Sequence, residues 1–489
     1  MRLTLSRKSI WERLPPTLRY GVGGLLRAIP QETLLGPRFC KTTHWLALSE
    51  RWPADRIRAY QLEQLRRICT LAYERAPFYR RWFERCGFRP DDLRRVEDLS
   101  ALPRIDKSVV RENLNAMCTR SRSSWDVERM STGGTGGQPL HFYIDADRSG
   151  TEYAYLVASW ARAGFTLGTP LAVLRGRVVR PRRDGLRHEY DPILRHHHYS
   201  SFHMTDENMR RYLKQIATLG PCFLHVYPSA VATLARFMQR CDIRAPDNIR
   251  GIIAESEIVY PEQRRTVEEV FGCRYFSCYG HSEKLVLAAE CERSTNYHVW
   301  PSYGYFELLD EDGRPVTSPG DRGEIVGTGF INTVVPFIRY RTGDYATYVG
   351  DRCEACGREH PIITEIRGHR TQEVLIAADG SEISWTAVNM HDDTFRNVQQ
   401  FQFYQVAPGQ ATLRLLPAEN FGGHDRRRIT RNLQRKLDGR FTFTIELVAA
   451  IPLSPRGKAI YVDQRVAPVA TTSTEAAHAT NPCASTPST

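Results

Sequence analysis

The sequence predicts an α/β protein, in which a large α/β domain with a helical N-terminal extension is followed by a small α+β C-terminal lid domain. Three observations support this fold class. Apolar residues recur at helical spacing in the first part of the chain, short apolar runs alternate with amphipathic stretches through the middle, and the pattern changes after Arg367. Because 489 residues exceed one compact core, two or more domains are expected.

The expected elements follow the chain in that order. Apolar residues repeat at helical spacing over 61–75, until Pro77 ends the pattern. Short apolar runs predict strands at 170–174, 251–254 and 323–327, and helices are expected between them at 207–219 and 229–240. Further along, strands are expected at 373–376, 401–406, 411–416 and 444–449, around one helix at 426–437.

These elements divide the chain into four parts. The expected boundaries are 1–120 for the helical N-terminal region of the large domain, 121–368 for the rest of that domain, 369–466 for the small domain and 467–489 for a tail. The tail consists mostly of Ala, Thr, Ser and Pro and is expected to be disordered, because it offers too little apolar surface to bury.

Composition and charge limit the class of protein. Hydrophobic residues make up 41% and charged residues 25%, as in soluble globular proteins, and no apolar stretch approaches the ~20 residues that span a bilayer. Prolines, arginines and glycines interrupt the segment after the basic N-terminus, so a cytoplasmic protein is expected rather than a secreted one. The net charge of +12 favours anionic partners such as nucleotides, coenzyme A or acidic glycans, or belongs to a solvated basic surface; no nucleic-acid-binding motif accompanies it.

The strongest local motif is Ser131–Pro139 (STGGTGGQP), which has four glycines and three hydroxyl residues in its first seven positions. Backbone N–H groups of such a loop can converge on phosphate oxygens, and the hydroxyls of Ser131, Thr132 and Thr135 add donors. The Gly-Lys-Ser/Thr ending of a Walker loop is absent. A flexible turn is the alternative, but the β-prone residues that follow at once favour an anchored loop and hence a nucleotide site.

Four segments in order resemble motifs of the acyl-adenylate-forming superfamily, which includes acyl-CoA synthetases and firefly luciferase. Ser131–Pro139 resembles its phosphate loop, and Tyr279-Gly-His-Ser-Glu283 resembles its Tyr-Gly-x-Thr/Ser-Glu motif. Tyr340-Arg-Thr-Gly-Asp344 matches its Tyr-Arg-Thr-Gly-Asp motif, and Ser454-Pro-Arg-Gly-Lys458 is similar to the loop that carries its catalytic lysine. The segments APFY at 76–79, LPRIDK at 102–107 and CEACGR at 353–358 are most similar to the phenylacetate–CoA ligase branch, nearest its capsular-polysaccharide-biosynthesis subgroup. The resemblance covers about residues 60 to 463.

The resemblance implies a ligase that uses ATP and Mg²⁺ to activate a carboxylic acid and most often transfers the acyl group to coenzyme A. Three catalytic residues are implied: Lys458 for charge stabilisation, Ser282 for the α-phosphate and Glu283 as a hard oxygen ligand of Mg²⁺. The implied nucleotide-binding residues are Ser131, Thr132, Gly133, Gly134, Thr135, Gly136, Ser256, Glu257, Tyr279, Gly280, His281, Arg341, Asp344 and Arg370.

The chemistry of these side chains agrees with the implied roles, although each has a structural alternative. The carboxylate of Asp344 suits both ribose hydroxyls, or else caps its own turn, and the ring of Tyr279 suits adenine, or else belongs to an ordinary bend. A lone Lys458 is otherwise a solvated surface residue. Ser256-Glu257 departs from the Gly-Glu that the superfamily has at the adenine-contacting turn.

A hinge is implied where the small domain would rotate between adenylation and transfer. The corresponding run is His369-Arg-Thr-Gln-Glu373, in which Arg370 would contact ribose or phosphate and Gln372 or Glu373 would be the pivot. His369 replaces the usual Gly and disfavours a positive φ. An exposed polar linker is the alternative interpretation.

The cysteines predict a possible zinc site. Cys353-Glu-Ala-Cys356 has the spacing that lets two thiolates bind one Zn²⁺, and Cys291 with His298 is the best second half. Such a Cys₃His site would be structural, and the phenylacetate–ligase branch has a similar arrangement; two reduced thiols on a loop are the alternative. The triple His196-His-His198 is expected to be a solvated or substrate-facing loop instead of a metal site.

The sequence does not identify the carboxylic acid. Arg175–Arg187 contains six arginines that suit an anionic acceptor or form a solvated loop. Some aromatic residues between the phosphate loop and Tyr279 could line an acyl pocket, although most are expected in the core: Tyr153, Tyr155, Trp160, Phe202 and Tyr227. An adenylate-forming amide or ester ligase with an amine or sugar acceptor is the alternative to a CoA ligase, and a non-catalytic nucleotide-binding protein is a further one.

Overall fold

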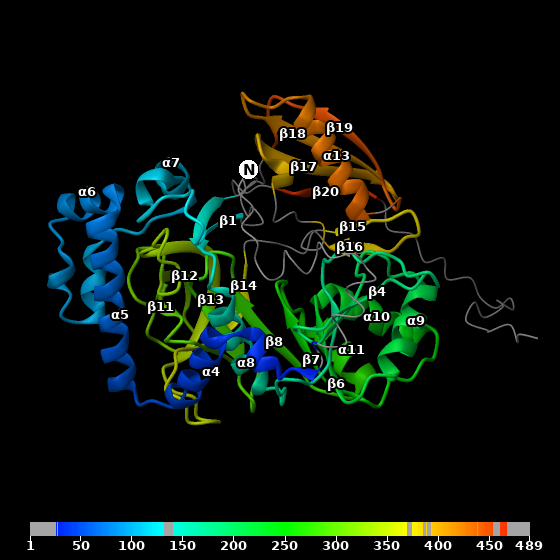
Figure 1. The fold of residues 1–489 in the computed structure, drawn as a ribbon, viewed down its shortest axis with the longest axis horizontal. Coiled ribbons are helices and arrows are strands. Elements are labelled where there is room, and N and C mark those ends of the chain that lie inside the picture. The colour runs from blue at the N-terminus through cyan, green and yellow to red at the C-terminus, as the bar shows by residue number, and fades with distance from the viewer. Residues whose placement is uncertain are drawn as a thin grey trace, which may run out of the picture.

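The computed structural model describes residues 26, 28–131, 140–368, 374–384, 388, 393–437, 439–452 and 460–466. The α/β fold class is confirmed: helices cover a large mixed sheet, and a smaller α+β unit follows it in the chain (Figure 1). The predicted domain boundaries stay a prediction, because the segment 369–373 lies outside the described residues. None of the described helices has the length and apolar character needed to cross a membrane.

The N-terminal region is helical, as its periodicity predicts. Its elements are α3 (Gln31–Leu35), α4 (Pro37–Ser49), α5 (Ala54–Arg75), α6 (Pro77–Arg85), the 3₁₀ turns η1 (Pro90–Asp92) and η2 (Val96–Ala101), and α7 (Lys107–Met117). The α5 helix buries its apolar stripe, and Pro77 opens α6 because its missing N–H is tolerated in a first turn. Asp106 caps α7, since its carboxylate accepts hydrogen bonds from the N–H groups of Ser108 and Val109.

A 12-stranded sheet forms the centre of the large unit, with strand order β11-β12-β13-β14-β10-β9-β8-β7-β6-β3-β5-β4. The strands are β3 (Leu171–Leu174), β4 (His188–Asp191), β5 (His196–Tyr199), β6 (Cys222–Val226), β7 (Ile249–Glu255), β8 (Tyr275–Gly280), β9 (Leu287–Glu290), β10 (Tyr297–Val299), β11 (Gly304–Leu309), β12 (Arg322–Gly329), β13 (Tyr340–Gly350) and β14 (Ile362–Arg367). A separate hairpin pairs β1 (Val127–Ser131) with β2 (His141–Asp145).

The run β8-β7-β6-β3-β5 is parallel, so the carboxyl ends of these strands meet at one edge of the sheet. The helices that alternate with these strands are α8 (Ser149–Ala161), α9 (Asp206–Ala217), α10 (Pro228–Arg240) and α11 (Pro261–Phe271). Residues at such an edge are the usual ligand-binding residues of α/β proteins.

Apolar side chains gather in three large clusters. One packs α5 to α7 and the β1–β2 hairpin against β11 to β13, and a second packs α4 and α8 against the parallel strands. Gly304 shows how closely these layers approach, because a Cβ atom there would lie 2.1 Å from the carbonyl oxygen of Leu285. The third cluster combines the α9, α10 and α11 side of the sheet with residues of the C-terminal unit.

The C-terminal unit contains two small sheets, β15 (Val374–Ile376) with β16 (Glu382–Ser384), and β19-β18-β17-β20. The remaining elements are η3 (Asp393–Phe395), β17 (Val398–Ala407), β18 (Gln410–Pro417), α13 (Gly423–Leu437), β19 (Thr442–Leu447) and β20 (Val462–Gln464). Arg236 on α10 forms an ion pair with Glu382 on β16 at 3.5 Å, which joins this unit to the large one. Figure 1 shows it on the opposite side of the molecule from the lower end of α5.

One local expectation is wrong. His196–His198 belong to β5, a strand between β3 and β4, and not to a solvated loop. The parallel pairing with β3 draws the segment into the sheet, where His196 and His198 are buried on the same face. Of the aromatic residues considered for an acyl pocket, four lie in the core: Tyr155, Trp160, Phe202 and Tyr227.

Candidate active site and metal cluster

The two sequence motifs nearest the predicted nucleotide meet on the large sheet. Tyr279 lies at the carboxyl end of β8, and Asp344 lies on β13. The Tyr279 hydroxyl donates a hydrogen bond to Oδ2 of Asp344 at 2.9 Å, across 65 positions of sequence. The tertiary structure therefore joins the expected adenine-facing ring and the expected ribose-binding carboxylate in one cluster.

The backbone around Asp344 is fixed by its own motif. The Thr342 hydroxyl donates to the carbonyl of Ile325 at 2.7 Å and accepts from the Asp344 N–H at 3.1 Å. Gly343 has φ of 75°, which only a residue without Cβ adopts readily. Burial raises the pKa of Asp344, and the hydrogen bond from Tyr279 offsets this only in part. Partners that donate hydrogen bonds to this carboxylate would therefore stabilise its charged form.

Glu283 is the acidic residue of the Tyr279–Glu283 motif and is buried, with 5% of its surface exposed. Its Oε1 accepts a hydrogen bond from the Tyr340 hydroxyl at 3.1 Å, and its Oε2 lies 3.3 Å from Nδ1 of His281. Burial opposes its ionisation, but the hydrogen bond and charge of His281 and the charge of Lys107 outweigh burial and lower the pKa of Glu283 to about 2. Glu283 is thus a carboxylate at neutral pH.

Lys107 is a charged residue near Glu283 and Asp344 that the motif analysis did not single out. The segment before α7 pairs with β13: Ile105 accepts a hydrogen bond from the Arg341 N–H at 2.8 Å and donates one to the Arg339 carbonyl at 3.0 Å. This pairing brings the start of α7 to the site, where the positive charge of Lys107 favours the ionised form of both Glu283 and Asp344. The only sequence signal for this placement was the LPRIDK segment, which does not indicate where it packs.

The Ser256–Glu257 turn directly follows β7 at the same sheet edge. Ser256 is exposed and has φ of 73°, and its hydroxyl accepts a hydrogen bond from Arg175 at 2.6 Å. Glu257 accepts hydrogen bonds from the N–H and hydroxyl of Ser229 at 2.8 and 3.1 Å. Both side chains therefore contact protein groups.

The other predicted residues are placed as follows. Ser131 is buried at the end of β1, Gly280 ends β8, and Ser282 is half-buried beside Glu283. Arg341 lies on β13 next to the site, where its side chain is 44% exposed and forms an ion pair with Glu324 at 2.8 Å. Outside the described residues lie Thr132, Gly133, Gly134, Thr135, Gly136, Arg370 and Lys458.

The structure brings the four predicted zinc ligands together. Cys291 follows β9, His298 lies on β10, and Cys353 and Cys356 lie on the loop between β13 and β14. Their ligand atoms all lie within 4.8 Å of one another; Sγ of Cys291 is 3.9 Å from Sγ of Cys353, and Sγ of Cys356 is 3.9 Å from Nε2 of His298. A tetrahedral Zn²⁺ with Zn–S bonds near 2.3 Å separates its sulfur ligands by about 3.8 Å, so the donor set fits zinc.

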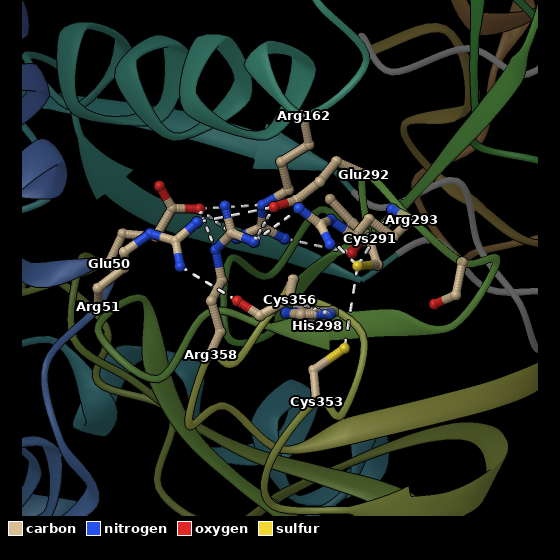
Figure 2. Close-up of polar contacts among 12 residues, drawn as sticks. Glu50, Arg51, Arg162, Cys291, Glu292, Arg293, His298, Cys353, Cys356 and Arg358 are labelled. Atoms are coloured by element: carbon tan, nitrogen blue, oxygen red, sulfur yellow. Dashed lines mark hydrogen bonds and ion pairs between the residues drawn. The ribbon is translucent and has the colours of Figure 1, made fainter.

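A network of arginines and glutamates lies beside this cluster of four predicted ligands (Figure 2). Arg358 contacts Glu292 at 2.6 Å and Glu50 at 2.9 Å, and Glu50 also accepts a hydrogen bond from Arg162 at 3.1 Å. Arg51 donates to the carbonyl oxygen of Cys356 at 3.1 Å. Because Glu50 and Arg51 lie between α4 and α5, the cysteine loop is tied to the N-terminal helices as well as to the sheet.

Curated proteins provide the first comparison. A phenylacetate–coenzyme A ligase of Pseudomonas putida is 28% identical over 294 residues, which span 59% of this chain and 66% of that protein. A phenylacetate–coenzyme A ligase of Thermus thermophilus is also 28% identical, over 67% of this chain and 73% of that protein. Protein CapK of Staphylococcus aureus is 24% identical over 74% of this chain and 79% of its own length. No protein-family profile matches the chain.

Solved structures show the same fold. A 2-hydroxyisobutyryl-CoA ligase in complex with 2-HIB-AMP and CoA superposes with a TM-score of 0.54 and 21% identity, covering 84% of this chain and 90% of that one. An open conformation of the same ligase gives a TM-score of 0.52 with 20% identity. Relatives and fold agree: the chain is a homologue of phenylacetate–coenzyme A ligases by sequence and shares the fold of the 2-hydroxyisobutyryl-CoA ligase.

Proposed function

We propose that the protein is a ligase that adenylates a carboxylic acid with ATP and Mg²⁺ and then transfers the acyl group to coenzyme A. The observation that carries this proposal is the cluster of Tyr279, Asp344 and Glu283, in which two motifs distant in sequence contact each other on the large sheet. The curated relatives named phenylacetate–coenzyme A ligase, and the 2-hydroxyisobutyryl-CoA ligase solved with 2-HIB-AMP and CoA, support both half-reactions.

In the first half-reaction, a carboxylate oxygen of the substrate attacks the α-phosphorus of ATP, and the bond to pyrophosphate breaks. Asp344 would accept hydrogen bonds from the ribose hydroxyls, and Tyr279 would pack against adenine while it holds the Asp344 carboxylate in place. Ser282 would bind the α-phosphate, and Lys458 would stabilise the charge that develops on the leaving group. In the second half-reaction, the thiolate of coenzyme A attacks the acyl carbon and AMP leaves.

Glu283 is the residue that we propose as the Mg²⁺ ligand. It is ionised, and its oxygens contact the Tyr340 hydroxyl and the His281 ring. A carboxylate offers about four lone-pair sites, so it can accept a further contact. Mg²⁺ prefers one or two carboxylates together with phosphate oxygens and water, which fits a single glutamate beside a triphosphate. Bound there, the ion would neutralise phosphate charge.

The metal cluster of Cys291, His298, Cys353 and Cys356 would hold a structural Zn²⁺. All four protein ligands are present, so no position is left for substrate, as in closed structural sites. We assign the metal a role in stability: it would fix the β13–β14 loop, and through Arg51 and Arg358 it would fix the junction of α4 and α5.

The segment 369–466 would be the mobile lid, with its pivot at Gln372 or Glu373 and with Arg370 near the ribose or phosphate. We place the enzyme in the cytoplasm, where both cosubstrates would be supplied. A second candidate is transfer of the acyl group to an amine or sugar, which the motif resemblance to the capsular-polysaccharide-biosynthesis subgroup favours.

Pyrophosphate release from ATP and Mg²⁺ tests the proposal directly. The assay uses a panel of aryl, fatty and amino acids, with and without coenzyme A, and compares wild type with Lys458→Ala. We expect acid-dependent release that falls by about 10²-fold or more in the variant, because one electrostatic contact to the transition state is lost. Dependence of AMP release on coenzyme A or on an amine decides the acceptor. No release with any acid would contradict the proposal.

A further inference from the structure

The turn after β7 has a backbone conformation that is unfavourable for a residue with a Cβ atom, and side-chain hydrogen bonds hold both of its residues. Ser256 adopts φ of 73°, a left-handed conformation in which a Cβ atom is disfavoured. The superfamily resemblance places glycine at this position, which would adopt that conformation without strain. A serine here needs a compensating interaction.

Arg175 supplies that interaction. It directly follows β3, and one of its terminal nitrogens donates to the Ser256 hydroxyl at 2.6 Å. The other terminal nitrogen lies 3.0 Å from Oε2 of Glu255 and 2.7 Å from Nε2 of His225, and the guanidinium carbon lies 5.2 Å from the centre of the Tyr227 ring. The planar guanidinium is thus held by groups of β6 and β7 while it contacts the turn.

The anchor of Arg175 is itself buried. Glu255 is 8% exposed, accepts a hydrogen bond from Nε1 of Trp160 at 2.9 Å, and lies 3.2 Å from Nε2 of His225. Two opposite charges in this position are stable only as a pair with further hydrogen bonds, which the structure provides. Arg175 is therefore held by His225 and Glu255 through one terminal nitrogen while the other donates to the Ser256 hydroxyl.

We propose that Arg175 is a positioning residue that holds the Ser256–Glu257 turn in its left-handed conformation for nucleotide binding. Glu257 fixes the other side of the turn through its two hydrogen bonds from Ser229 at the start of α10. Where a glycine would adopt the left-handed conformation without strain, Ser256 is instead stabilised in it by the hydrogen bond from Arg175. This inference rests on the proposed function, in which the turn contacts the nucleotide.

The test compares two substitutions that remove the same hydroxyl and differ only in Cβ. The probe is ATP with Mg²⁺, and the readout is its Kd for the full-length chain, measured by titration calorimetry. Ser256→Ala keeps the strain without the hydrogen bond and is expected to weaken binding about tenfold, which equals about 1.4 kcal/mol. Ser256→Gly loses the hydrogen bond and the strain together and is expected to weaken binding only about threefold.

Arg175→Lys extends the test, because lysine can still pair with Glu255 but cannot bridge to Ser256. We expect about tenfold weaker binding, and recovery to about threefold when Ser256→Gly is added. A purely structural role of Arg175 would give no such rescue.

Equal Kd values for Ser256→Ala and Ser256→Gly would overturn the inference while leaving ATP binding intact. Absence of ATP binding by the wild type would overturn the proposed function and this inference together. If Arg175→Lys does not fold, as judged by thermal melting, the Ser256 pair decides alone.

Discussion

The proposed zinc cluster and the proposed nucleotide site belong to the same large sheet and its loops, but their charged groups are arranged differently. In the zinc cluster, the donor atoms of Cys291, His298, Cys353 and Cys356 lie close together, and the charges of neighbouring Arg358 and Glu292 are paired with each other. In the nucleotide site, burial raises the pKa of Asp344, whereas His281 and Lys107 help lower the pKa of Glu283. The comparison suggests that the first region stabilises the fold, while the second holds charge that a ligand would stabilise.

The largest expected effect is loss of the metal. We expect about one zinc per chain in the wild type, and Cys353→Ser is expected to abolish it and to lower the melting temperature by at least about 5 °C, because binding energy of a structural metal is folding energy. Metal analysis and thermal melting measure both. The control is Cys86→Ser, which changes a half-buried thiol outside the cluster. Metal-free wild type, or a Cys353→Ser variant that melts like wild type, would contradict the structural role.

The second largest expected effect is a loss of activity without a loss of stability. Asp344→Asn is expected to reduce acid-dependent pyrophosphate release by about 10²-fold, since a neutral amide is a poorer partner for two ribose hydroxyls than a carboxylate. Its melting temperature is expected to stay the same or to rise, because the variant removes a charge that burial disfavours and keeps an oxygen for Tyr279. A large drop in melting temperature would show that Asp344 stabilises the fold. The predicted difference from the zinc cluster, whose loss lowers stability, would then not exist.

The smallest effect is a difference in pH dependence between the two carboxyls. The folded-state pKa of Glu283 is lowered to about 2 from 4.5, so its contribution to stability is complete above about pH 4.5 and is lost as the pH falls toward 2. The stability deficit of Glu283→Gln is therefore expected to shrink between pH 6 and pH 3. Asp344 has a raised pKa, so any stability gain of Asp344→Asn is expected at neutral pH and should vanish on acidification.

Thermal melts of the three proteins without nucleotide, between pH 3 and pH 7, measure these differences. Wild type serves as the reference at each pH, which cancels the titration of all other groups. Parallel melting curves for Glu283→Gln and Asp344→Asn across this range would mean that the two carboxyls do not differ in the way their surroundings indicate.

Much of the fold was predictable because its local patterns are strong. The helix predicted at 229–240 is α10 (Pro228–Arg240), and the strand predicted at 251–254 lies within β7 (Ile249–Glu255). The β5 histidines were missed since three polar residues in a row do not resemble a buried strand; pairing with β3 and β4 overrides that local preference. The four residues predicted to bind zinc do meet in space, and the two-residue spacing of Cys353 and Cys356 was the local pattern that indicated half of this group.

The sequence by itself determined the α/β class, because this class follows from the short-range periodicity of apolar residues. It also determined the order of the motifs and the chemical types of the predicted site residues, because these are read directly from short segments. Only the tertiary structure decided that the charge of Lys107 lies near enough to favour the ionised forms of Glu283 and Asp344, and that Arg175 donates to Ser256. The physical reason is that these contacts depend on strand pairing and strand order. The pairing of Ile105 with Tyr340 joins segments more than 200 residues apart, and the adjacency of β3, β6 and β7 joins the carboxyl ends of three strands, which no local pattern encodes.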